Sequence, residues 1–359
     1  MASVNKRPDG KWRARYRDAD DKEHARHFAT KREGQAWLNS VAVSLVNGTY
    51  IDPKTAKTTV GEWCATWVRG YESKRKSTVK QARSHLKHIE KAFGNRALAD
   101  VRPSEVKSWV VTLQESGLAV STVYAIHSRL SQLYADAVHD GIVSKSPASR
   151  RTSPPAAKQR PYVATTEQIW ALHDAMPEGM RPVVLLGAFA GLRVGEIAAL
   201  RVVDVDLMRG VIHPAIQYPS EPLKTEISRT PVPIPNELAL EINRVPVKWG
   251  SPTFVVGAFG RPVAPFTIEV AFAKVRVTID GLPTGFRIHD LRHYFASMLI
   301  AAGLDVKVVQ ARLRHSSAKT TLDTYSHLWP EKDESARAAV ANVFAARADS
   351  VRTDAATSL

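Results

Sequence analysis

The sequence predicts a multidomain protein: a small β-sheet-plus-helix unit, an all-α bundle and an α+β domain. Residues 11–17 alternate with period two, which is typical of a strand, whereas apolar residues recur at helical spacing through residues 59–143. After residue 161, helical patterns mix with short strand-like runs. A chain of 359 residues is long enough to bury two or three cores.

The first unit, residues 1–58, carries a strand with two different faces. In KWRARYR (residues 11–17) apolar and basic side chains alternate, so one face packs and the other is free to bind phosphate. A second strand is expected through His27 and Phe28, and Thr30 with Glu33 forms a capping box that opens a helix. Residues 49–58 are interpreted as a linker. The candidate DNA-binding residues of this unit are Lys11, Arg13, Arg15 and Arg17.

Four helices are expected in the second unit, residues 59–143. Gly94, Gly117 and Gly141 lie just past three of the expected ends, and Pro103 suits a first helical position. Such apolar spacing is ordinary for any helical bundle, so it predicts a fold and not a function. The expected spans are 60–71, 78–93, 103–116 and 121–140. Residues 144–161 hold four prolines and little apolar content, which indicates an interdomain linker.

The charge of the chain is regional. Residues 1–155 hold 27 Lys and Arg against 15 Asp and Glu, so this part carries +12 of the formal net charge of +15. A solvated basic surface would explain a high pI, but a regional excess interleaved with Trp and Tyr favours a polyanion partner. The single cysteine, Cys64, excludes an internal disulfide, and no apolar run approaches about 18 residues. We therefore expect a cytoplasmic protein without a membrane partner.

Residues 287–325 concentrate reactive side chains. A helix beginning near Ile288 would place His289, Arg292 and His293 on one face, because they are spaced i, i+3 and i+4. His315 follows a second expected helix, residues 305–313, and Tyr325 comes ten residues later. Arg and His donors suit a phosphodiester, and a tyrosine beside them is a candidate nucleophile.

A zinc site is the alternative for the two histidines at i and i+4. The first is followed by Asp290 and not by the Glu of the H-E-x-x-H motif, and no third ligand is obvious. We therefore expect no metal.

Five ordered segments resemble the conserved boxes of the tyrosine recombinases, the phage integrase family. They are GLRVGEIAAL (191–200), LKTEISRTPVPIP (223–235, the lysine hairpin), HDLRH (289–293), LRHSS (313–317) and TTLDTYSH (320–327). One departure stands out: the family usually has Gly where this chain has Arg314.

The resemblance implies a role for each matching residue. Tyr325 would attack the scissile phosphate to form a 3′-phosphotyrosine, and Lys224 would protonate the leaving 5′ oxygen. Arg193 and Arg292 would bind the non-bridging oxygens. The supporting residues would be His289 as proton acceptor, His315 as a phosphate donor, and Glu196 and His293 as orienting groups. No cofactor or metal is implied.

The resemblance also implies a domain plan and partners. Residues 1–58 would be an arm-type DNA-binding domain, 59–143 a SAM-like core-binding domain, 162–330 the catalytic domain and 331–359 a tail that docks on a neighbouring subunit or folds back. The implied partners are double-stranded DNA with core-type and arm-type attachment sites, a homotetramer on that DNA, a host DNA-bending factor and an excisionase. The alternatives are a Xer-type chromosome-dimer resolvase, a topoisomerase and a non-catalytic DNA-binding regulator.

Overall fold

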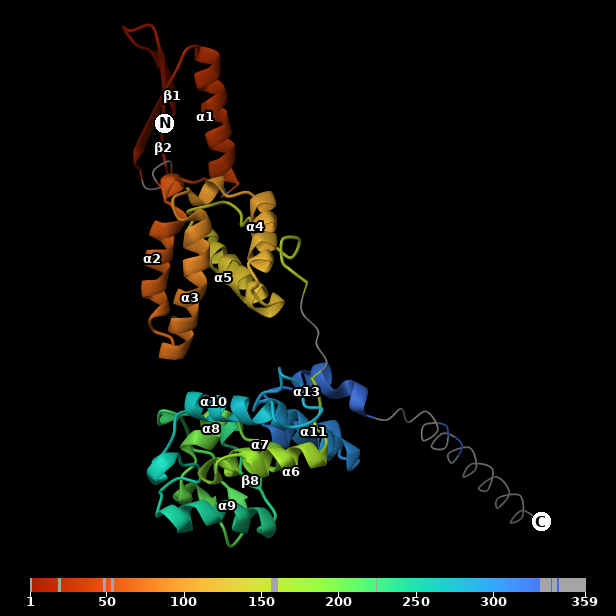
Figure 1. Cartoon of the computed structure of the whole chain (residues 1–359). Helices are drawn as coiled ribbons and strands as arrows, with labels where there is room; N and C mark the ends of the chain where they lie inside the picture. Colours follow the sequence, from red (N-terminus) through yellow and green to blue (C-terminus); the bar gives the residue numbers. More distant parts are fainter. Residues whose placement is uncertain are drawn as a thin grey trace, which may run out of the picture. The chain divides into compact units, whose positions relative to one another are not determined.

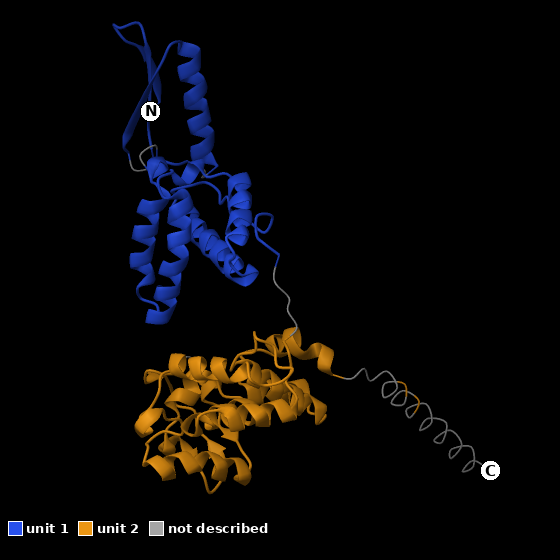
Figure 2. Ribbon diagram, viewed as in Figure 1, with its two compact units in different colours: residues 1–158 blue, residues 159–359 orange. Residues whose placement is uncertain are grey.

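The chain divides into two compact units, residues 1–158 and 159–359 (Figure 2). The computed structural model describes residues 2–18, 21–47, 50–52, 55–155, 161–223, 225–329, 337 and 341. Lys224 lies outside the described residues, and so does nearly all of the tail, residues 331–359.

Unit 1 begins with an antiparallel sheet and one helix. These elements are β1 (Ser3–Lys6), β2 (Trp12–Arg17), β3 (Glu23–Phe28) and α1 (Lys31–Val46), with strand order β1-β2-β3 (Figure 1). Ala14 and Tyr16 are buried beneath α1 while their neighbours in β2 are exposed, so the predicted two-faced strand is confirmed. The capping box of Thr30 and Glu33 is confirmed as well. The strand β1 was not predicted.

The segment that follows α1 is attached to the sheet. The Tyr50 hydroxyl lies 2.8 Å from the Tyr16 hydroxyl, and the Lys22 ammonium forms an ion pair with the Asp52 carboxylate. Residues 50–52, which belong to the expected linker, are therefore held by the N-terminal sheet.

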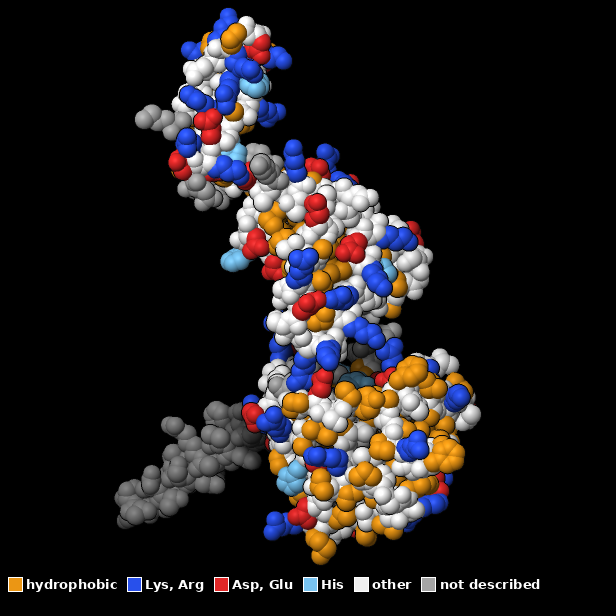
Figure 3. All heavy atoms as spheres, turned by 90° about the vertical axis from the view of Figure 1, so that its left-hand side faces the viewer, with side chains coloured by type: hydrophobic (Ala, Val, Ile, Leu, Met, Phe, Trp, Pro, Cys, Tyr) orange, Lys and Arg blue, Asp and Glu red, His pale blue; other side chains and the backbone are white. Residues whose placement is uncertain are grey.

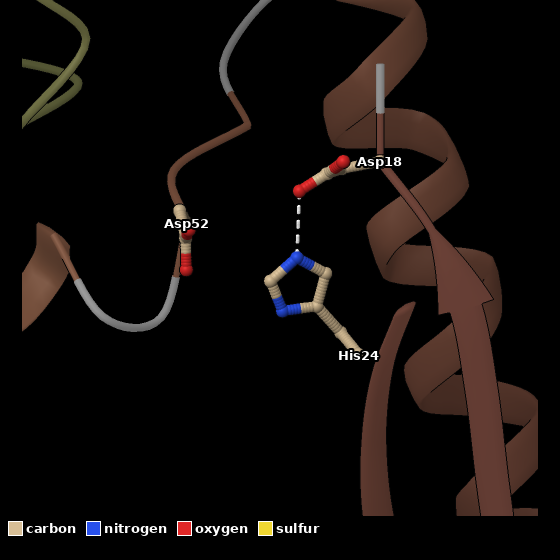
Figure 4. Close-up of side chains that lie close together, drawn as sticks. All are labelled: Asp18, His24 and Asp52. Carbon is tan, nitrogen blue, oxygen red and sulfur yellow. Dashed lines mark hydrogen bonds and ion pairs between the residues drawn. The ribbon is translucent and has the colours of Figure 1, made fainter. Parts of the chain in front are cut away.

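Three potential metal ligands lie together at this attachment. Asp18, His24 and Asp52 each offer one ligand atom, all within 4.8 Å of one another (Figure 4). His24 Nε2 lies 2.6 Å from Asp18 Oδ2. Because the Lys22 ammonium already places a cation against Asp52, we interpret the cluster as part of the attachment and not as a metal centre.

The second part of unit 1 is a helical bundle. It contains α2 (Val60–Tyr71), α3 (Lys76–Phe93), α4 (Pro103–Glu115) and α5 (Val120–His139), with 3₁₀ turns η1 (Thr55–Lys57) and η2 (Leu98–Asp100). The four predicted helices are confirmed, although α3 begins two residues earlier than expected. Two buried donors of the bundle are satisfied by backbone carbonyls: Trp63 Nε1 donates to the Leu133 carbonyl at 2.9 Å and the Tyr134 hydroxyl to the Leu98 carbonyl at 3.1 Å.

Unit 2 is the α+β domain. Its helices are α6 (Thr166–Ala175), α7 (Pro182–Phe189), α8 (Val194–Ala199), α9 (Asn236–Trp249), α10 (Pro265–Arg276), α11 (Asp290–Ala301), α12 (Val306–Leu313) and α13 (Ala318–Tyr325). Its strands are β4 (Val205–Asp206), β5 (Val211–Ile212) and β8 (Val232–Pro233) in one sheet, with β6 (Ile216–Gln217) and β7 (Glu221–Pro222) in another. Its 3₁₀ turns are η3 (Glu178–Met180), η4 (Val202–Asp204), η5 (Glu226–Arg229), η6 (Ala258–Gly260) and η7 (Ser326–Leu328).

Helix α7 forms the centre of unit 2. Seven of its eight residues are buried, and it packs directly against α11, where a Cβ at Gly187 would meet Leu291. This close approach brings the first arginine box, which follows α7, next to the helix that carries Arg292. In the part of the chain that the structure describes, no helix is both long and apolar enough to span a membrane.

Candidate active site

Arg292 connects three of the five boxes. Its side chain is 2% exposed, and its guanidinium donates to the Gly191 carbonyl before α8 and, at 2.7 Å, to the Leu313 carbonyl at the end of α12. Burial, together with the charges of Arg193 and Arg314, lowers the pKa of Arg292 to about 9. The residue therefore stays cationic at neutral pH.

One buried carboxylate holds two arginines. Glu196 Oε1 accepts from Arg193 Nη1 at 2.9 Å, and Glu196 Oε2 accepts from Arg314 Nη2 at 2.5 Å. Burial acts to raise the pKa of Glu196, but the charge of Arg314 and the hydrogen bond from the Arg193 backbone N–H outweigh it, so the pKa is lowered. Glu196 is thus an ionised anchor, and Arg193, with its side chain 39% exposed, can still reach a ligand.

The nucleophile candidate is buried and hydrogen-bonded to a histidine. Tyr325 ends α13 and is 2% exposed, and its hydroxyl lies 2.6 Å from His293 Nδ1. Burial raises the pKa of Tyr325 to about 12, against the opposing charge of Arg292. Burial and the neighbouring His289 and Arg292 lower the pKa of His293 to about 4. The imidazole is therefore neutral at neutral pH and can accept a hydrogen bond from the phenol.

The other two histidines lie in the same cluster. The His289 and His293 rings have centroids 5.4 Å apart, and partial exclusion of water, then the charge of Arg292, lower the pKa of His289. His315 Nδ1 lies 3.0 Å from Thr321 Oγ1, and burial, then Arg292, lower the His315 pKa to about 4. Sequence spacing predicted the cluster, but it gave no sign that His293, rather than His289, contacts the tyrosine.

The segments on either side of Lys224 contribute to this site. A cavity of about 300 Å³ is lined by Arg193 and Arg314 together with Leu223, Thr225 and Ser228, which belong to the lysine hairpin. Residues adjacent to Lys224 on both sides thus line the same cavity as the arginines.

The basic face of β2 carries internal pairs. Arg13 Nη2 donates to Glu23 Oε1 at 3.1 Å, Arg15 Nε to Ser3 Oγ at 2.9 Å and Arg17 Nη1 to the Asp21 carbonyl at 2.8 Å. Exposed pairs of this kind contribute little to stability and can be exchanged for phosphate contacts. Lys11 lies immediately before β2 and is also exposed.

Two family models match the chain. Residues 163–332 match the phage integrase family and residues 2–46 match the phage integrase N-terminal domain, together more than half of the chain.

Three similar proteins are an ICEBs1 integrase, a prophage integrase and a recombinase. The ICEBs1 integrase of Bacillus subtilis is 26% identical over 270 residues, covering 69% of this chain and 73% of that protein. The putative prophage phiRv2 integrase of Mycobacterium tuberculosis is 24% identical over 348 residues, covering 90% of each. Tyrosine recombinase XerC of Mycobacterium leprae is 28% identical over 272 residues, covering 72% of this chain and 89% of that protein.

Solved integrase structures share the fold. The Tn1549 transposon integrase in complex with transposon right end DNA has a TM-score of 0.69 at 20% identity, covering 79% of this chain and 99% of that one. A lambda integrase dimer bound to a core site has a TM-score of 0.62 at 18% identity, with coverage of 91% and 96%. A lambda integrase tetramer bound to a Holliday junction has a TM-score of 0.60 at 19% identity, covering 88% of this chain and 96% of that one.

The fold and the site define a tyrosine recombinase. The chain belongs to the phage integrase family.

Proposed function

We propose that this chain is the integrase of a phage or related mobile element, which cuts and rejoins DNA at specific sites through a 3′-phosphotyrosine. The observation that carries the proposal is the Tyr325 hydroxyl held on His293 Nδ1 within the cluster that also contains Arg292. A phenol, a proton acceptor and a fixed cation are the parts that a tyrosine needs to attack a phosphodiester.

The phosphate would be bound by Arg193 and Arg292. Two of the five N–H donors of Arg292 are used on the Gly191 and Leu313 carbonyls, which fixes the guanidinium and leaves the others for non-bridging oxygens. Glu196 fixes Arg193 in the same way. His315, held by Thr321, would add a further donor. These groups stabilise the charge that develops in the transition state.

The covalent step exchanges one phosphate ester for another. The Tyr325 oxygen bonds to phosphorus as its proton passes to His293, which lies against the His289 ring. The bond to the 5′ oxygen breaks, and that oxygen takes a proton from Lys224. Religation is the reverse, so no external energy source is needed.

A suicide substrate tests this function. With a nicked core-site duplex that loses its 5′-hydroxyl strand after cleavage, the full chain should accumulate a covalent protein–DNA complex that survives denaturing gels. The yield should be the same with excess chelator, because the proposed chemistry uses no metal. Absence of the complex with the cognate core site would refute the proposed function, and its loss only in chelator would restore the metal alternative.

We propose that the DNA partner is bound by both units. A groove along α3 of about 750 Å³ is lined by Lys74, Lys76, Lys80, Arg83 and Lys87, which supports a core-site contact for residues 59–143. Figure 3 shows Lys and Arg side chains spread over unit 1 and hydrophobic side chains gathered on a face of unit 2.

Exposed apolar residues of unit 2, among them Met208, Phe259 and Phe266, support contacts with other subunits in a homotetramer on DNA. A host DNA-bending factor and an excisionase complete the proposed assembly.

The match of residues 2–46 favours an integrase over a Xer-type resolvase, which typically lacks an arm-type domain. The XerC relatives keep the resolvase as the second candidate.

Replacing Arg13 and Arg15 by glutamine in the full chain should weaken binding to arm-type DNA. Each lost phosphate contact should lower the slope of log affinity against log salt by about 0.9, so the pair should lower it by about two units. Core-site cleavage should be unchanged, whereas recombination of a full attachment site should fall.

Arg209→Gln is the matched control, because this arginine is 85% exposed in unit 2 and pairs locally with Asp206. An unchanged salt slope in the Arg13 and Arg15 variant would contradict the arm-domain interpretation and favour the resolvase.

A further inference from the structure

Arg314 occupies a backbone conformation that favours glycine. It caps the C-terminus of α12 with φ 52° and ψ 45°, the left-handed region in which a side chain is disfavoured. The turn is thus the one that a glycine would form. The backbone conformation therefore does not explain why Arg occupies position 314, and the reason must lie in the contacts of its side chain.

The Arg314 side chain is buried and connects two distant segments. It is 1% exposed, its Nη2 donates to Glu196 Oε2 at 2.5 Å, and its Nη1 donates to the Ser228 carbonyl at 2.9 Å. Glu196 belongs to the first arginine box, while Ser228 belongs to the lysine hairpin. Both contacts are charge-assisted and directional, so the guanidinium fixes the distance between the two segments.

Ser228 lies close to Lys224 along the hairpin. It is part of η5, and its N–H donates to Thr225 Oγ1 at 3.3 Å, directly after position 224. On the other side, Leu223 is buried and its N–H donates to the Ala215 carbonyl at 3.4 Å. The Arg314 contact therefore fixes the C-terminal flank of Lys224, just as the Leu223 contact fixes its N-terminal flank.

We propose that Arg314 is a positioning residue that holds the lysine hairpin, through Ser228, against the Arg193–Glu196 pair, and so supports the general-acid step that the proposed function gives to Lys224. This inference rests on the proposed function. Direct binding of phosphate by Arg314 is the competing role. It is disfavoured because the Arg314 charge is already paired with the buried Glu196 carboxylate, whereas Arg292 donates only to neutral carbonyls.

The test compares two substrates of the Arg314→Gly chain. Glycine fits the left-handed turn, so the variant removes the side chain without backbone strain. Cleavage of an ordinary phosphodiester should slow by about 10-fold to 100-fold, because a misplaced general acid loses part of its usual effect. On a substrate with a sulfur leaving group at the 5′ position, which needs no proton, the rate should lie within a few-fold of wild type.

Arg193→Lys is the control, since it alters a proposed phosphate contact and should slow both substrates alike. If the glycine variant does not fold, Arg314→Lys can replace it, because lysine keeps the charge beside Glu196 but cannot make both contacts. The same quantity is measured, the rate on the sulfur substrate divided by the rate on the ordinary phosphodiester. Equal slowing on both substrates would mean that Arg314 binds the phosphate directly. No slowing on either substrate would mean that Arg314 does not position the lysine hairpin for catalysis. A wild-type chain that forms no covalent complex would refute the proposed function itself. This outcome can be distinguished from failure of the Arg314 proposal, in which the wild-type chain still forms the complex.

Discussion

The Tyr325→Phe chain should form no covalent complex with core DNA. Only the attacking oxygen is removed, and loss of a catalytic nucleophile lowers rates by at least about 10⁴-fold. The ring still fills its place among Phe295, Leu313 and the rest of that apolar cluster, so specific DNA binding should stay close to wild type. Denaturing gels with the suicide substrate, alongside a gel-shift titration, measure the two properties separately.

Tyr294→Phe provides a matched control. This tyrosine lies on α11, and its hydroxyl is 3.0 Å from Thr166 Oγ1, so the substitution also deletes one partly buried hydrogen bond, like the one between Tyr325 and His293. Each variant should lose about 1 kcal/mol of stability. Only Tyr325→Phe should lose cleavage. An undiminished covalent complex in that variant would mean that another residue is the nucleophile.

Much of the fold follows from local sequence signals. The helices of the bundle were predictable because Val123, Ile126 and Leu130 recur at helical spacing and form a buried face of α5. Alternation in β2 likewise predicted which side chains are buried. Both signals depend on a period within one element, and a single sequence carries that information directly.

The first arginine box is followed by a 3₁₀ turn and a strand of only two residues. Residues 202–206 form η4 and then the two-residue β4, because the Asp204 carboxylate accepts from the Arg201 backbone N–H at 3.1 Å and from the Arg201 guanidinium at 2.7 Å. Such a side-chain cap tightens the chain into a 3₁₀ turn in competition with a strand.

The contacts that define the candidate site were not predictable from periodicity. His293 and Tyr325 lie 32 residues apart and meet because α12 packs against both α11 and α13, and Arg314 and Glu196 lie 118 residues apart. Spacing of i, i+3 and i+4 placed His289 and His293 on neighbouring turns but could not tell which one the tyrosine approaches. Tertiary packing decides that choice.

Lys224→Ala should slow cleavage of an ordinary substrate by about 100-fold to 10,000-fold, the usual effect of a positioned proton donor. The sulfur-leaving substrate needs no proton, so the variant should recover most of its rate on it. Arg193→Ala should remain slow on both, because the phosphate still requires stabilisation. Arg193 is the suitable comparison since its side chain is 39% exposed, whereas Arg292 is buried and its loss would leave the Gly191 and Leu313 carbonyls without their donor.

The Lys224→Ala and Arg314→Gly changes also predict a result for their combination. If Arg314 acts through Lys224, the double variant should be no slower than Lys224→Ala alone, because a hairpin without its acid has nothing left to position. Single-turnover rates on both substrates measure this. Equal failure of Lys224→Ala on the sulfur and oxygen substrates would mean that Lys224 does not protonate the leaving group, and fully multiplicative losses would mean that Arg314 acts independently of it.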